Sequence, residues 1–190
     1  MSLTQPDSPR TGEQFAMPPY PRELEQQMSL AGLDVLLRPI RPEDASAYAD
    51  FIARTAAEDL RMRFFTLRRR LPAKDLARYT EIDYQREMAF VALPEKGSGE
   101  ILGEVRIYCF SDGATAEFAL LVRSDVQRRG LGRALLAKAI EYSRARGATA
   151  LLGQMRPDNE AMIALARALG MQVEVTPDVS FAVAHLDLAI

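Results

Sequence analysis

The segment best suited to chemistry runs from Val122 to Leu136, where an apolar strand pattern gives way to a helical one. Two glycines at this junction, Gly130 and Gly132, allow the backbone to pass close to a ligand. The first N–H groups of a helix have no partner within the helix and attract anions. The junction is therefore a candidate phosphate or pyrophosphate site. The alternative is a tight loop in which the glycines serve only close helix packing.

Two common nucleotide-binding loops do not match this segment. A P-loop ends in Gly-Lys-Ser or Gly-Lys-Thr, and that ending is missing here. A dinucleotide fingerprint has a third glycine where this sequence has Leu135. The fingerprint also belongs to a parallel β-α-β unit, whereas antiparallel hairpins are predicted before this segment. An anion-binding loop of another kind remains.

The elements around this loop can be read from the apolar pattern. Strands are predicted over residues 34–40, 88–93, 100–110, 116–122, 150–155, 171–175 and 179–188. Helices are predicted over residues 42–54, 72–78, 130–146 and 157–169, and residues 22–30 have helical potential. Short turns make the strands between 88 and 122 antiparallel neighbours, whereas a helical crossover makes strand 150–155 parallel to the one before it. The fold class is α+β, with a mixed sheet of six to seven strands flanked by helices.

Composition restricts the chain to one domain. Its 190 residues, 48% of them hydrophobic, can form a globular core. The proline-rich residues 1–32 are expected to be a tail or linker, partly extended, and residues 33–190 the folded domain.

Composition and charge also argue against nucleic acid, metal ions and membranes as partners. The formal charge of −2 gives no net field for nucleic acid, so the arginine-rich residues 60–70 are interpreted as a helix or turn with solvated arginines. One cysteine and one histidine cannot build a disulfide or a Cys/His zinc site, and no metal is expected. The sequence has no membrane-spanning apolar run and no signal peptide, which favours a cytoplasmic protein without a membrane partner.

A family resemblance makes the loop more specific. Gln127-x-x-Gly130-x-Gly132 resembles the acyl-CoA signature of the GCN5-related N-acetyltransferase (GNAT) superfamily. The segment from Asn159 to Leu169-Gly170-Met171 is similar to the Asn-led helix that borders the pantetheine arm in that family. The predicted order of elements from about residue 33 to 190 also matches, which implies the GNAT fold.

Further segments resemble the acetyltransferase domain of bacterial protein lysine acetyltransferases of the Pat type. These segments are residues 19–21, 38–44, 63–65, 82–84, 86–89 and 116–119. The resemblance implies transfer of an acetyl group from acetyl-CoA to a primary amine, expected to be a protein lysine such as one on a metabolic enzyme. Pat-type proteins often carry an acyl-CoA synthetase-like region that this sequence lacks, so the chain is a free-standing relative or an excised domain.

This chemistry needs a base. An amine attacks a thioester only when it is neutral, and a lysine with a pKa of about 10.4 is almost wholly protonated near neutrality. Glu117, on the strand before the loop, matches the general base of Pat-type enzymes, and Glu104 on the adjoining strand is the reserve candidate. The alternative for Glu117 is a partly exposed carboxylate paired with an arginine.

The resemblance also implies the acetyl-CoA ligands. Loop N–H groups would bind the pyrophosphate, three arginines would add charge, and the end of the preceding strand would pair with the pantetheine amides. The expected set is Leu120, Leu121, Val122, Gln127, Arg128, Arg129, Gly130, Leu131, Gly132, Arg133 and Asn159.

Other roles remain open at this point. Many family members use a tyrosine to protonate the departing thiolate, and here Ala166 takes its place, so that role has no occupant. Cys109 and His185 are expected to be structural, because a direct transfer needs no acyl-enzyme. A small-molecule amine N-acetyltransferase and a non-catalytic acyl-CoA sensor are the alternative functions, and the oligomeric state is open.

Overall fold

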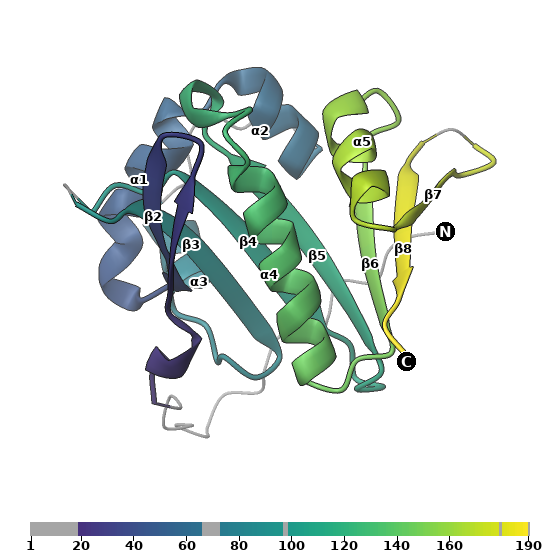
Figure 1. The fold of residues 1–190 in the computed structure, drawn as a ribbon, viewed down its shortest axis with the longest axis horizontal. Coiled ribbons are helices and arrows are strands. Elements are labelled where there is room, and N and C mark those ends of the chain that lie inside the picture. The colour runs from purple at the N-terminus through teal and green to yellow at the C-terminus, as the bar shows by residue number, and fades with distance from the viewer. Residues whose placement is uncertain (1–18, 66–72, 97–98, 179, 190) are drawn as a thin grey trace.

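The structure is a computed structural model that describes residues 19–65, 73–96, 99–178 and 180–189. It contains one eight-stranded sheet in the order β1-β2-β3-β4-β5-β6-β8-β7, flanked by helices (Figure 1). The strands are β1 (Gln26–Leu30), β2 (Leu33–Pro39), β3 (Glu87–Pro94), β4 (Gly103–Cys109), β5 (Thr115–Val122), β6 (Ala150–Met155), β7 (Gln172–Val175) and β8 (Ala182–Asp187). The helices are α1 (Ala45–Arg54), α2 (Ala57–Phe64), α3 (Ala73–Thr80), α4 (Leu131–Ala145) and α5 (Glu160–Ala168).

The predicted α+β class and strand directions are confirmed. Strands β3, β4 and β5 form an antiparallel meander, β5 and β6 are parallel, and β7 and β8 close the chain as an antiparallel hairpin. The order along the sheet adds one feature that the sequence did not predict, because β8 inserts between β6 and β7.

The N-terminal part of the sheet differs from the prediction. Residues 22–30, expected to be helical, form a short 3-10 turn followed by β1, which pairs antiparallel with β2. Gly32 closes this hairpin with φ of +71°, a left-handed conformation that glycine adopts without strain. The sheet therefore has eight strands rather than six or seven, and it begins before the domain boundary expected at residue 33.

Helices cover both faces of the sheet. On one face α4 packs so closely on β4 that a Cβ added at Gly103 would lie 2.9 Å from Leu135. On the opposite face Tyr48 of α1 reaches Glu104 of β4. Helix α2 ends at Phe64, whereas residues 66–70 of the arginine-rich segment lie outside the described residues. No helix in the described ranges is long and apolar enough to cross a membrane.

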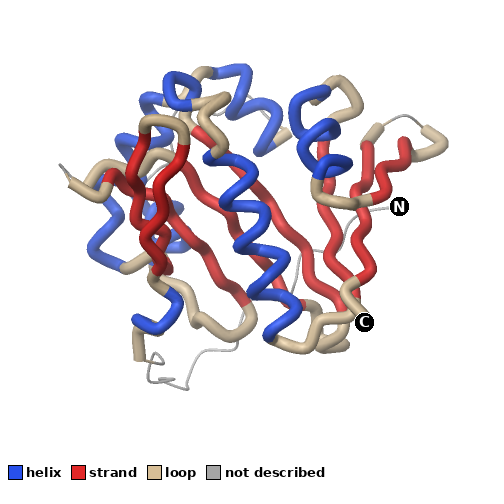
Figure 2. The backbone as a smooth tube through the Cα atoms, viewed as in Figure 1, coloured by secondary structure: helices blue, strands red, loops and turns tan. Residues whose placement is uncertain are grey.

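Strands β5 and β6 pair over only part of their length. Their parallel ladder joins Thr115–Phe118 to Ala150–Gly153 and then ends, although β5 continues to Val122 and β6 to Met155. Beyond this ladder the two strands diverge, as the red strands beside α5 show (Figure 2). One backbone edge of β5 is consequently unpaired beside the loop that leads into α4.

Candidate active site

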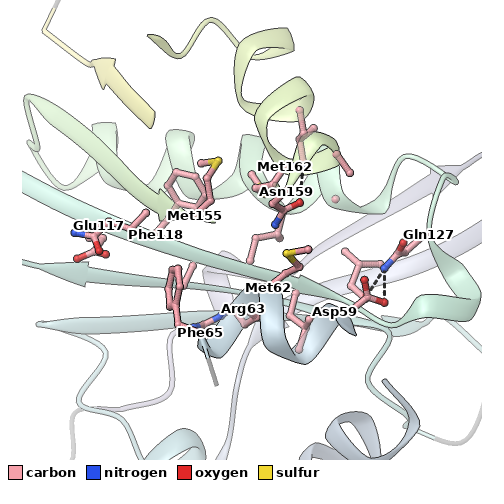
Figure 3. A pocket seen from close by; sticks show the side chains of 18 of the residues that line it. Asp59, Met62, Arg63, Phe65, Glu117, Phe118, Gln127, Met155, Asn159 and Met162 are labelled. Carbon is pink, nitrogen blue, oxygen red and sulfur yellow. Dashed lines mark hydrogen bonds between the residues drawn. The ribbon is translucent and has the colours of Figure 1, made fainter. Parts of the chain in front are cut away.

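The gap between β5 and β6 is a cavity of about 390 Å³. Its walls come from α2, β4, β5, the loop before α4, β6 and α5 (Figure 3). Gln127 lies towards one end of the cavity and Glu117 towards the other, with Arg63 and Phe65 of the α2 region between them in the view of Figure 3. An elongated ligand can therefore reach from the loop to the carboxylate.

The loop at the Gln127 end has the free backbone N–H groups of a candidate anion site. The N–H groups of residues 127–133 donate no hydrogen bond to any described part of the chain, and the N-terminus of α4 has no side-chain cap. Arg128 with φ of +62° and Gly130 with φ of +86° adopt left-handed conformations. Left-handed residues in a loop can turn neighbouring N–H groups towards one concavity, a geometry found in phosphate-binding loops.

Gly132 has a packing role. A Cβ added there would lie 3.4 Å from Cδ2 of Leu165 and 3.7 Å from Val122, so glycine allows α4 to approach α5 and β5. The packing interpretation from the sequence thus applies to Gly132, whereas the phosphate-site interpretation of the glycine pair stays a prediction.

The Gln127 side chain braces the loop. Its Nε2 donates to the Val122 carbonyl and to Oδ2 of Asp59, both at 3.1 Å. The Ser124 hydroxyl also donates to Asp59 and accepts the Ala56 N–H at 2.9 Å. These contacts fix α2 against the loop, leaving the Gln127 main chain to face a ligand.

The other predicted acetyl-CoA ligands divide into two groups. Leu120, Leu121, Val122, Gln127, Arg128, Gly132 and Asn159 line the cavity, whereas Arg129, Gly130, Leu131 and Arg133 are outside its lining. Leu131 is buried in the core, and Arg133 donates to the Ala168 carbonyl at 3.4 Å. For these outer residues only the main-chain N–H groups or a flexible arginine could contact a bound phosphate.

Glu117 lies half-buried in the cavity wall, directly opposite Tyr108 across the β4–β5 ladder. It makes no hydrogen bond or ion pair with any described residue, so the expected alternative of a carboxylate paired with an arginine does not match its contacts. Burial raises the pKa of Glu117, and the positive charge of Arg63 partly offsets that rise.

Glu104 occupies a closed network instead. It is 1% exposed, and its carboxylate accepts from Nε of Arg106 at 3.0 Å and from the Tyr48 hydroxyl at 2.9 Å. Arg106 also donates to Glu87 and to the Tyr79 carbonyl. With both oxygens engaged beneath α1 and α3, Glu104 is a structural ion pair away from the cavity, and it is not placed to serve as the reserve base.

Residues of α2 and β4 complete the cavity, and the sequence assigned them no role. Asp59, Met62, Arg63 and Phe65 come from the α2 region. Tyr108 comes from β4, and its burial raises its pKa to about 12, so its hydroxyl keeps its proton at neutral pH. The segment 63–65 had been singled out only for its family resemblance.

Helix α5 forms the remaining wall. Asn159 caps it by accepting the Met162 N–H at 3.1 Å, and Met162 and Leu165 face the cavity. Ala166 is fully buried outside the cavity lining. Cys109 and His185 are also outside the lining, and burial raises the pKa of the Cys109 thiol, which disfavours a nucleophilic thiolate.

Comparisons with known proteins agree with this geometry. Residues 34–172 match the family model for the acetyltransferase (GNAT) domain. The chain is 32% identical over 155 residues to acetyltransferase PA5475 of Pseudomonas aeruginosa, covering 81% of this chain and 83% of that protein.

Solved structures share the fold. The crystal structure of the GNAT domain of S. lividans PAT aligns with a TM-score of 0.81 at 28% identity, covering 89% of this chain and 99% of that one. The structure of yncA from Salmonella typhimurium, which holds its cofactor acetyl-CoA, aligns with a TM-score of 0.63 at 22% identity, over 82% of this chain and 94% of that one. By family model, relatives and fold, the chain belongs to the GNAT family of acyl-CoA-dependent N-acetyltransferases.

Proposed function

We propose that this enzyme transfers the acetyl group of acetyl-CoA to a primary amine, with a protein lysine as the acceptor and Glu117 as the general base. The observation that carries the proposal is the unpartnered, half-buried Glu117 in the wall of a cavity that also contains the anion-binding loop. The protein acceptor is supported by the resemblance of several segments, such as residues 38–44 and 116–119, to Pat-type protein lysine acetyltransferases.

The residues present fit acetyl-CoA. The free N–H groups of residues 127–133 suit the pyrophosphate, and Arg128 adds positive charge at the cavity. The unpaired edge of β5 offers main-chain groups to the amides of the pantetheine arm, in the manner of an added strand. The donor would then extend from the loop towards Glu117.

The proposed chemistry is a direct transfer. Glu117 accepts a proton from the acceptor ammonium, and the neutral nitrogen forms a bond to the acetyl carbon while the carbon–sulfur bond breaks. The sulfur leaves with the bonding electrons as thiolate, and the second proton, which the nitrogen loses as it becomes the amide, converts the thiolate to the CoA thiol. A thiol with a pKa of about 8.5 is a competent leaving group without a dedicated acid, which is consistent with Ala166 at the position of the family's tyrosine.

Two assays test the proposal. Calorimetry is expected to detect acetyl-CoA binding, and no binding at millimolar concentration would exclude it. Incubation of a cell lysate with acetyl-CoA and the enzyme, read by mass spectrometry, is expected to give new acetyl-lysines. Acetylation confined to small amines would indicate the small-molecule enzyme, and binding without any amine-dependent CoA release would indicate a sensor.

A further inference from the structure

We propose that Arg63 makes this site selective for acceptors that carry a carboxylate close to the primary amine. The inference rests on the proposed function and goes beyond it, because it assigns the chemistry of the acceptor rather than the reaction. The ligand chemistry is a carboxylate, supplied either by an acidic residue beside a protein lysine or by the acid group of a small amino compound.

Arg63 presents an unsatisfied guanidinium to the cavity. It stands in the last turn of α2, lines the cavity, and its Nε atom is buried without a hydrogen-bond partner. No described residue forms an ion pair or hydrogen bond with it, and its two terminal nitrogens retain contact with solvent. Within the described ranges the fold thus provides no acceptor for this guanidinium, and its terminal nitrogens can pair with a carboxylate that a bound acceptor brings.

The three arginines that are buried within the described ranges are all paired. Arg38 contacts Asp44 at 2.7 Å, Arg106 contacts Glu104 at 2.5 Å, and Arg123 contacts Asp125 at 2.6 Å. The fold therefore supplies carboxylates to guanidiniums wherever they are structural. Arg63 differs in facing a cavity with its carboxylate position open.

The guanidinium is held in a geometry that suits a carboxylate. Its Cζ lies 4.9 Å from the centre of the Phe64 ring, and Phe64 packs edge-on against Tyr79 with ring centres 6.2 Å apart. An arginine stacked on an aromatic ring keeps its N–H groups in the plane and available at its edge. A carboxylate in the cavity can bind that edge with two parallel hydrogen bonds from the terminal nitrogens.

The location places this carboxylate beside the reacting amine. The charge of Arg63 is close enough to act on both Glu117 and Tyr108, while Glu117 forms no ion pair with it. An ammonium group that approaches Glu117 therefore also meets the positive charge of Arg63. A carboxylate on the acceptor neutralises that charge, whereas an acceptor without one leaves two cations close together.

The test compares matched acceptors. The first pair is a lysine peptide with glutamate beside the lysine and the same peptide with glutamine there, and the second pair is free lysine and lysinamide. The wild-type enzyme is expected to favour the acidic member of at least one pair by about 10- to 100-fold in kcat/KM, the size of a charge-assisted hydrogen bond. The pair that shows the preference identifies the source of the carboxylate.

Variants assign the preference to Arg63. Arg63→Gln is expected to abolish it, chiefly by raising KM for the acidic member, with acetyl-CoA affinity and melting temperature retained. Arg63→Lys should keep part of it, since a lysine retains the charge without the planar fork. Arg144→Gln, which removes an exposed arginine of α4 away from the cavity, is the control for net charge and should leave the preference unchanged.

A binding titration keeps the inference separate from the proposed function. Each acceptor is titrated into the protein saturated with CoA, with wild type and Arg63→Gln in parallel. If the acidic member binds more tightly to wild type but not to Arg63→Gln, the role of Arg63 is supported. An absence of acetyl transfer in the same experiment would contradict only the proposed function. Equal kcat/KM and equal binding within both pairs, an unchanged preference in Arg63→Gln, or a matching loss of acetyl-CoA affinity would each overturn the inference.

Discussion

The ring of Phe118 occupies the space that a side chain at Gly153 would need, because a Cβ there would lie 2.3 Å from Cε1 of the ring. These two residues form the last pair of the parallel β5–β6 ladder. Beyond them the strands separate and the cavity begins, with Phe118 in its wall. The contact between an aromatic ring and a glycine thus stands at the point where the sheet opens.

Gly153→Ala should damage both folding and donor binding. The added methyl group cannot coexist with the present Phe118 ring, and overpacking of this kind costs about 1–3 kcal/mol of unfolding free energy. Urea unfolding and acetyl-CoA calorimetry measure the two effects. The double variant Gly153→Ala with Phe118→Leu provides the control, since a smaller side chain should recover part of the stability, and no recovery would contradict the steric explanation.

Glu104→Gln should impair folding rather than chemistry. The substitution leaves Arg106, which is fully buried, without the charge of its buried carboxylate partner and with only the partly exposed Glu87. Breaking a buried ion pair from one side costs about 3–5 kcal/mol. Denaturant unfolding is expected to show this loss, while kcat per folded molecule at a temperature below the transition stays near wild type. A large fall in kcat without destabilisation would restore Glu104 as a candidate base.

The features that could be predicted from the sequence are local ones. Gly130 and Gly132 mark the loop because a strand pattern and a helical pattern meet there, and the alternation of β5 places Glu117 beside apolar residues. Strand β1 was not predicted, because it begins with Gln26 and Gln27 and so lacks an apolar alternation at its start. Its pairing depends on β2 and on the turn at Gly32.

The features that could not be predicted depend on contacts between distant segments. Alternation places Glu104 and Glu117 on the same face of the sheet, but only the fold shows that Tyr48 covers one and the cavity borders the other. The role of Arg63 likewise arises from the approach of α2 to β5, which no local spacing reports.

Glu117→Gln should remove most turnover and leave acetyl-CoA affinity nearly unchanged. The variant keeps the size of the side chain and loses the proton acceptor, and general-base catalysis contributes about 10²- to 10⁴-fold. Measuring kcat and the acetyl-CoA Kd tests this, with Glu174→Gln on the exposed β7 as the matched control. Higher pH should partly rescue the variant because more acceptor amine is neutral. Near wild-type kcat would refute the assignment.

The acidic limb of the pH–rate profile should follow the ionisation of the Glu117 carboxyl group. Burial raises its pKa above the ordinary value of 4.5, so kcat/KM for the free enzyme should rise with pH through a midpoint above that value. Arg63 lowers this pKa, and Arg63→Gln should therefore move the midpoint to higher pH. Arg144→Gln should leave it in place. A midpoint that does not move in Arg63→Gln would mean that another group controls the limb.

The same pKa shift predicts how stability changes with pH. Folded Glu117 keeps its proton at pH values where the unfolded chain has lost it, so the folded state loses stability as pH rises from 4.5 through the raised pKa. Glutamine has no such ionisation. Glu117→Gln should therefore match the wild-type melting temperature below the ordinary carboxyl pKa and exceed it near neutral pH. Calorimetry at both pH values measures the difference in melting temperature between the variant and the wild type. If the variant melts below the wild type at neutral pH, the ionised carboxylate stabilises the fold and the prediction is wrong.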